Sequence, residues 1–389
     1  MTSHAEPDRA ISSTAGKTSG ARLLALDWMR GIVILLMAVD HSSGEFNAGR
    51  LMTDSAFMYH AGTPLPLAQF LTRFITHLCA PTFVFLAGAS LALSIGRRVE
   101  RGERAASIDR QLLIRGLVIV TLELVPTYFW MPPGKYLAQV LYAIGTAYLF
   151  MIPLRRLPVT ALVGLGAAVL VLGEGLIDLA GWRAPAPAPL LATLLLSGGP
   201  RGALIVAYPT LPWLSILLLG WGFGELLRRQ PAERALRGRW LPAVGVALLA
   251  GFFVVRGVNG YGNMALLRED GSLAQWLHVS KYPPSVTFVA LELGILALAL
   301  AALQGLAAAR ERSSGRWAPL LVFGQTPMFF YVLHIPLLAL TARALGLEHR
   351  LGIGAAFAFA ALAALVLFPL CYWYRSYKFE HPTGFTRYL

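Results

Sequence analysis

Ten apolar runs of roughly 20 residues constrain this chain more than any other feature of its sequence. A helix of about 20 apolar residues spans the hydrocarbon core of a bilayer. Only helices and closed barrels satisfy every backbone N–H and C=O group there. The sequence therefore predicts an all-α, polytopic membrane protein with about ten transmembrane helices, at 24–41, 69–96, 114–131, 136–154, 158–180, 204–226, 240–258, 284–308, 318–341 and 352–374.

The composition favours a membrane protein over a nucleic-acid-binding one. Hydrophobic residues make up 56% of the 389 residues, and charged residues only 14%. The formal net charge of +13 would suit nucleic acid, but the basic residues lie in short segments between apolar runs, as membrane topology requires. We therefore expect membrane lipids and no nucleic acid as partners. The two cysteines, Cys79 and Cys371, lie in apolar runs, and no Cys/His spacing indicates a metal site.

The distribution of basic residues predicts the orientation of the runs. An even number of spans leaves both ends of the chain on one side. If that side is cytoplasmic, 22 of the 33 Lys and Arg residues lie inside and 8 lie in outer segments. Cytoplasmic loops carry such an excess. We predict a disordered cytoplasmic tail over 1–21, a transmembrane domain over 22–375 and a cytoplasmic C-terminal tail over 376–389.

The first apolar run, LALDWMRGIVILLMAVDH, carries charged residues near both of its ends. A charge at the centre of a spanning helix costs about 2.5–3.5 kcal/mol, so such residues usually face a protein or water interior. Arg30 and His41 are eleven positions apart, about three turns, so they share one face roughly 16 Å apart along the axis. In the predicted orientation Asp27 and Arg30 lie near the cytoplasmic surface, and Asp40 and His41 lie near the outer one. This pattern would suit a reaction that reaches across the bilayer.

The second run adds a further pair of ionisable groups. Arg73 and His77 are spaced i, i+4 and share a face of its outer half. We expect His41 and His77 to lie at similar depth on antiparallel helices. Two imidazoles would suit general acid–base chemistry near neutral pH, with Asp40 orienting one of them. An interhelical salt-bridge network without catalysis is the alternative.

Five blocks of the chain carry a further pattern: RLLALDWMRGIVILLMAVDH (22–41), FLTRFITHLCAPTFVFLAGASLAL (70–93), AYPTLPWLSILLLGWGFG (207–224), VSKYPPS (279–285) and LLVFGQTPMFFYVLHIPLL (320–338). Together they resemble the catalytic-domain family of heparan-α-glucosaminide N-acetyltransferase, in particular its bacterial members. Arg30 and His41 also match the R-x10-H pattern of the acyltransferase 3 family. In the lysosomal enzyme the catalytic histidine lies in the loop after the first helix, where His60 is the nearest match.

The resemblance implies acyl transfer across a bacterial inner membrane. The donor would be a cytoplasmic acyl-CoA, such as acetyl-CoA, and the acceptor an amine or hydroxyl of a sugar, glycan or lipid-linked molecule at the outer face. Arg30 with Asp27 would hold the donor. The expected catalytic residues are His41, His77, Asp40 and His60, and the expected acceptor-binding residues are Arg73, Lys281 and Tyr282.

Two other functions fit the same residues. A proton-coupled transporter or flippase of an amphipathic solute could use intramembrane His and Asp residues as a proton relay. A membrane scaffold with structural ion pairs is the third interpretation. The sequence leaves open direct transfer against an acyl-histidine intermediate, and a homodimer against other oligomeric states.

Overall fold

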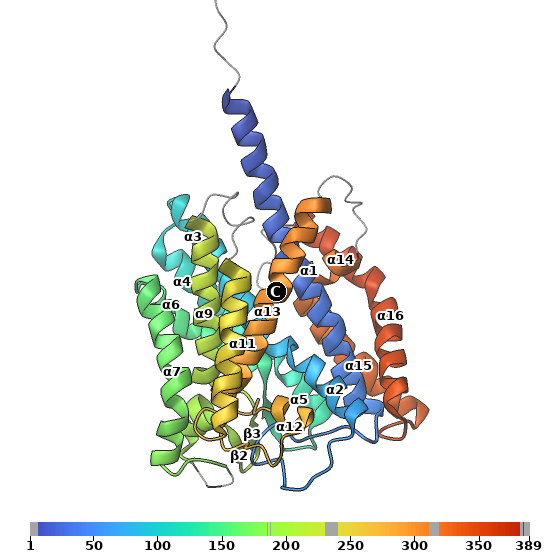
Figure 1. Cartoon of the computed structure of the whole chain (residues 1–389). Coiled ribbons are helices and arrows are strands. Elements are labelled where there is room, and N and C mark those ends of the chain that lie inside the picture. Colours follow the sequence, from blue (N-terminus) through green and yellow to red (C-terminus); the bar gives the residue numbers. More distant parts are fainter. Residues whose placement is uncertain are drawn as a thin grey trace, which may run out of the picture.

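Long helices dominate the computed structural model (Figure 1), which describes residues 7–229 except 185 and 187, 240–310, 319–381 and 384. For 7–23 and 308–310 it describes the backbone alone. The elements are α1 (Pro7–Phe46), α2 (Leu67–His77), α3 (Cys79–Glu100), α4 (Ala105–Leu122), α5 (Leu124–Trp130), β1 (Tyr136–Ala138), α6 (Val140–Leu154), α7 (Val159–Leu179), α8 (Leu190–Ala192), the π-helix η1 (Thr193–Ser197), β2 (Gly199–Arg201), β3 (Leu204–Val206), α9 (Thr210–Arg229), α11 (Trp240–Val258), α12 (Leu273–Leu277), α13 (Val286–Arg310), α14 (Pro319–Gln325), α15 (Pro327–Leu345) and α16 (Ile353–Glu380).

Eight helical stretches of the described chain are long and apolar enough to cross a membrane, which confirms the all-α, polytopic membrane class. Two further predicted runs, 24–41 and 136–154, correspond to part of α1 and to α6. These two are not among the eight, so the count of ten stays a prediction, as does the orientation. The eight are Leu67–Glu100, Ala105–Trp130, Val159–Leu179, Thr210–Arg229, Trp240–Val258, Val286–Ala307, Pro327–Leu345 and Ile353–Glu380.

Three runs that the sequence predicts as single spans are each divided into two helices, and a proline follows each break. Because proline lacks an N–H, the carbonyl four residues before it loses its helical partner. Accordingly α2 ends at His77, four residues before Pro81, and α4 ends at Leu122, four residues before Pro126. Pro327 begins α15, and proline disfavours helical geometry in the residue before it.

A small sheet replaces the start of two predicted spans. Strand β3 pairs in parallel with β1 and antiparallel with β2, in the order β1-β3-β2. The expected helices over 136–154 and 204–226 are therefore wrong at their first residues, where strands precede α6 and α9. Figure 1 shows β2, β3, α5 and α12 together at the end of the molecule where α1 stops, away from the protruding N-terminal part of α1. We call this the sheet end.

Helix α1 packs against α13, α14, α15 and α16 and begins at Pro7, within the segment predicted as a tail. Its contact with α14 is made backbone to backbone. A Cβ placed on Gly324 would overlap the carbonyl of Asp27, and one on Gly31 would overlap the carbonyl of Leu320. Small residues let membrane helices approach this closely. The contact fixes α1, and with it Asp27, against the helix pair α14 and α15.

Candidate active site

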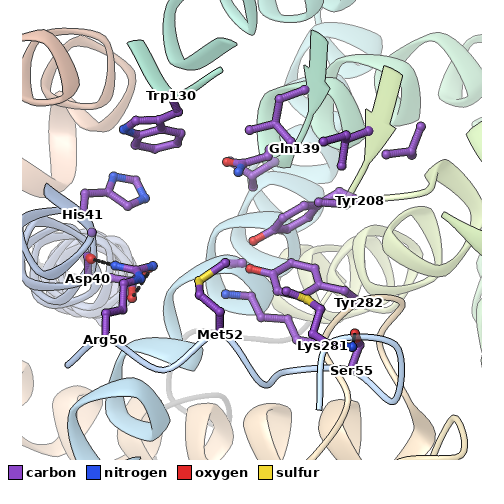
Figure 2. A pocket seen from close by; sticks show the side chains of 18 of the residues that line it. Asp40, His41, Arg50, Met52, Ser55, Trp130, Gln139, Tyr208, Lys281 and Tyr282 are labelled. Atoms are coloured by element: carbon purple, nitrogen blue, oxygen red, sulfur yellow. Dashed lines mark hydrogen bonds and ion pairs between the residues drawn. The ribbon is translucent and has the colours of Figure 1, made fainter. Parts of the chain in front are cut away.

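A cavity of 890 Å³ lies at the sheet end, and one of its walls is the end of α1. Of the predicted site residues, five line it together: Asp40, His41, Arg73, Lys281 and Tyr282. Figure 2 shows the Tyr208 and Tyr282 hydroxyls and the Lys281 ammonium pointing across the cavity towards α1. The loop after α1, strands and helix ends supply the remaining wall, which includes Trp130, Gln139, Ile205, Val206, Ala207 and Tyr331.

His41 is held between two aromatic groups. Its Nδ1 lies 2.7 Å from Nε2 of His334, and the planes of the two rings are nearly parallel, with centroids 4.9 Å apart. The Trp130 ring meets His41 edge-on at 4.8 Å. Trp130 is itself fixed, since its indole N–H donates to Glu45 at 2.7 Å. His41 therefore has a defined ring orientation within the cavity.

Asp40 takes part in a cation network and not in a histidine pair. Its carboxylate accepts from Arg73 at 2.5 Å, from Arg50 at 3.3 Å and from Thr76 at 3.2 Å. Among the described residues it forms no hydrogen bond to a histidine. Adjacent residues of a helix point in different directions, which explains why Asp40 does not orient His41 as the sequence had suggested.

His77 lies in a buried network beside the cavity and is not among the residues that line it. Its Nε2 is 3.1 Å from Asp54, which also accepts from Arg73 Nε at 2.8 Å. Burial raises the pKa of Asp54, but Arg73 and His77 outweigh it and hold this pKa well below its usual value. The structure thus places His77 with an ion pair and not with His41.

The loop histidine His60 is exposed, and it lines neither this cavity nor the second one described below. Its carbonyl oxygen accepts from the Thr63 hydroxyl at 2.6 Å. His278, a buried histidine of the described loops, lies 2.7 Å from the carbonyl of Thr53 through Nε2. In the described part of the chain, neither of these two rings forms a hydrogen bond with His41.

Lys281 is almost fully buried at the cavity wall. Its ammonium lies 5.3 Å from the ring centroid of Tyr282 and 6.0 Å from that of Tyr208, within the range of cation–π attraction. No described carboxylate forms an ion pair with it. The cavity therefore holds a cation that is free to meet an anionic or strongly polar group.

A second cavity, of 560 Å³, is lined by Asp27 and Arg30. Arg115, Arg375, Lys378 and His381 also line it, and Asp27 is its sole acidic residue among those described. We call it the basic cavity. Its chemistry suits an anionic ligand.

Hydrogen bonds fix part of the basic cavity and leave part of it unpaired. Arg30 donates to Asp27 at 2.5 Å and also to Ser90. Asp27 accepts from Gln325 at 3.0 Å, across the close contact between α1 and α14. The Nε atoms of Arg115 and Arg375 are buried without a hydrogen-bond partner in the described structure. Unpaired buried donors of this kind are expected where a ligand supplies the acceptors.

The two cavities are adjacent, and the side chains that line both of them form what we call the junction. Met37, Phe83, Val140 and Tyr331 line both of them. The Tyr331 hydroxyl is buried and has no partner among the described residues, and its ring lies 6.1 Å from that of His41. The junction is thus apolar except for one free hydroxyl.

The sequence alone does not identify several of these site residues or their contacts. The pair between His41 and His334 joins residues 293 positions apart, which helical spacing cannot predict. Arg375 is the last residue of the predicted transmembrane domain, just after the last apolar run, and no spacing pattern marks it. Tyr331 and Trp130 are ordinary aromatic residues in apolar runs, and no local pattern distinguishes them. Among the described residues no group of three or more His, Cys, Asp and Glu could hold a metal ion.

Comparison with known families gives one match. The profile of the family described as "Heparan-alpha-glucosaminide N-acetyltransferase, catalytic" matches residues 22–254, more than half of the chain. The chain belongs to this family. It is therefore a multi-pass membrane protein of an acetyltransferase family, and the match contains both Arg30 and His41. It ends within α11, so Tyr331, His334 and Arg375 lie outside it. A search of curated proteins found no match.

Proposed function

We propose that this protein transfers an acetyl or other acyl group from acyl-CoA in the basic cavity to an amine or hydroxyl in the sheet-end cavity. The junction of the two cavities beside His41 is the observation that supports this most directly. Arg30 and His41 lie on one helix, one at each cavity, roughly 16 Å apart along its axis. A donor held by its phosphates at Arg30 could thus present its thioester near His41.

The basic cavity suits the phosphate groups of CoA. Arginine binds phosphate oxygens through paired, charge-assisted hydrogen bonds. Arg115 and Arg375 have buried N–H groups without partners, and Lys378 adds a further positive charge. We further propose that this cavity opens to the cytoplasm of a bacterium, that the protein lies in the inner membrane, and that both of its ends are cytoplasmic.

The sheet-end cavity suits a polar acceptor such as a sugar, glycan or lipid-linked saccharide. Aromatic residues with polar tips, Trp130, Tyr208 and Tyr282, surround it, and such groups combine apolar contact with hydrogen bonding. Arg73 and Lys281 could bind acceptor hydroxyl or acidic groups. In the proposed orientation this cavity faces the outer side of the membrane.

His41 and Tyr331 have complementary roles in this proposal. His41 removes a proton from the acceptor while the acceptor attacks the thioester carbonyl. The free hydroxyl of Tyr331 donates a hydrogen bond to the carbonyl oxygen, where negative charge develops. His77 has no part in this scheme because its ring binds Asp54 outside both cavities. A route through an acyl-histidine at His41 would use the same groups.

Binding of acetyl-CoA to purified protein in nanodiscs, measured by calorimetry, tests the donor site. Arg375→Ala should weaken binding by about tenfold or more, because one charge-assisted hydrogen bond contributes roughly 1.5–3 kcal/mol. Arg97→Ala is the matched control, since Arg97 is exposed and lines neither cavity. Absence of binding to the wild type would refute the proposal and favour a transporter. If Arg375→Ala and Arg97→Ala bind acetyl-CoA equally well, Arg375 is not part of the donor site.

A further inference from the structure

His334 defines which nitrogen of His41 carries a hydrogen. Its side chain is fully buried in α15, and its Nδ1 lies 3.0 Å from the carbonyl oxygen of Phe330. A carbonyl only accepts, so this Nδ1 carries the hydrogen. No described carboxylate touches His334, and a buried unpaired imidazolium is strongly disfavoured. The ring is therefore neutral, and its Nε2 holds a lone pair.

That lone pair determines the tautomer of His41. Nε2 of His334 and Nδ1 of His41 are 2.7 Å apart, so one of them must donate. Since Nε2 of His334 can only accept, Nδ1 of His41 carries the hydrogen. Nε2 of His41 then holds a lone pair, and no described residue forms a hydrogen bond with it.

We propose that His334 is a positioning residue, which holds His41 in the Nδ1–H tautomer so that its Nε2 is the base of the reaction. This inference rests on the proposed function. An aspartate commonly has this role beside a catalytic histidine. Here a neutral histidine fills it, while the nearby Asp40 binds arginines.

The arrangement also determines the path of the proton. His334 cannot pass a proton onwards, because its Nδ1–H already binds a backbone carbonyl. The acceptor X–H gives its proton to Nε2 of His41 as the bond from X to the carbonyl carbon forms. The carbon–sulfur bond then breaks, and the leaving thiolate takes the proton from the same nitrogen. The products are acylated X and the free CoA thiol, and His41 returns to its starting tautomer.

Nitrogen NMR of ¹⁵N-histidine-labelled protein in nanodiscs tests the tautomer without any substrate. The chain has eight histidines, so a His41→Gln difference spectrum identifies the His41 signals. We expect a protonated Nδ1 and an unprotonated Nε2 in the wild type. In His334→Leu both tautomers should be present. A wild-type His41 protonated at Nε2 would overturn the inference.

Kinetics test the role itself. His334→Leu should lower kcat by roughly 10- to 10²-fold, less than removal of the base, with KM for acetyl-CoA unchanged. His334→Gln should keep most of the kcat that His334→Leu loses, because the side-chain oxygen of the glutamine can accept a hydrogen bond from His41. Thr341→Val is the control, since it removes another side-chain bond to a carbonyl of α15, outside both cavities.

The two variants at position 334 separate positioning from packing. Equal loss of kcat in His334→Leu and His334→Gln would show that the ring is needed for packing alone, and the inference would be wrong. If the wild type transfers no acyl group, the proposed function fails. The NMR result then still decides whether His334 sets the tautomer.

Discussion

The substitution Tyr331→Phe removes a single oxygen atom at the junction of the two cavities. The ring remains and keeps its contacts with His41 and with His334, whose centroids lie 6.1 and 5.6 Å away. Because the hydroxyl has no described partner, the folded protein loses no hydrogen bond. An unpaired buried hydroxyl costs about 1–3 kcal/mol, so thermal stability should stay the same or rise.

The expected effect on catalysis is much larger. Loss of one donor to a developing oxyanion lowers kcat by roughly 10²–10³-fold, or about 2.7–4 kcal/mol. A neutral hydrogen bond that only helps to hold the substrate is worth about 0.5–1.5 kcal/mol, which corresponds to a tenfold effect or less. The two roles for Tyr331 therefore differ by at least an order of magnitude in the measured rate.

The assay is release of the free thiol from acetyl-CoA, with glucosamine as the amine probe, by protein in nanodiscs. Tyr374→Phe is a matched control, because the Tyr374 hydroxyl is also buried without a partner but its residue lines neither cavity. We expect the control to keep wild-type kcat. A Tyr331→Phe variant with kcat within tenfold of wild type would refute the oxyanion role.

Three further predictions concern the base, the topology and the buried ion pair. His41→Ala should lower kcat by roughly 10²–10⁴-fold and His60→Ala far less; the reverse order in the same assay would place the base in the loop. Single cysteines at the exposed positions Arg101 and Ala61 should react with an impermeant thiol reagent from opposite faces of the membrane. Both native cysteines are buried and should give little background labelling. Labelling of both positions from one face of intact cells would contradict the predicted topology. Asp54→Asn should destabilise the fold by about 3–5 kcal/mol. Since the folded pKa of Asp54 is depressed, its stabilisation is complete above the unfolded pKa of about 3.9 and is lost as the pH falls further; acid unfolding curves that coincide for variant and wild type would argue against this ion pair.

Local patterns in the sequence were sufficient for the parts of the site that lie on one helix. The spacing of Arg30 and His41 predicted that one face of α1 reaches two different environments, and each residue does line a different cavity. The interhelical salt bridge that the sequence left as the alternative is present between Asp40 and Arg73. Such predictions rest on helical geometry and on the cost of burying charge, which act at every position of a helix.

Partners that come from distant segments could not be predicted in this way. Asp54 and His334 are each the partner of a predicted histidine, but packing of separate helices and loops brings them there. The divided helices show a different limitation. Mean hydropathy over 20 residues ignores the missing N–H of Pro81 and Pro126, so it predicts one continuous helix for each of these two runs.

The junction between the cavities has a consequence for the cell's ion gradients. In the proposed orientation the two cavities reach in from opposite sides of the membrane, so only a short barrier to water and ions separates them. Met37, Phe83 and Val140 make most of that barrier apolar. Apolar constrictions exclude ions because water withdraws from them. In the proposed orientation these three side chains would keep ions from crossing the membrane here, and a polar residue in place of any of them should increase the leak of protons.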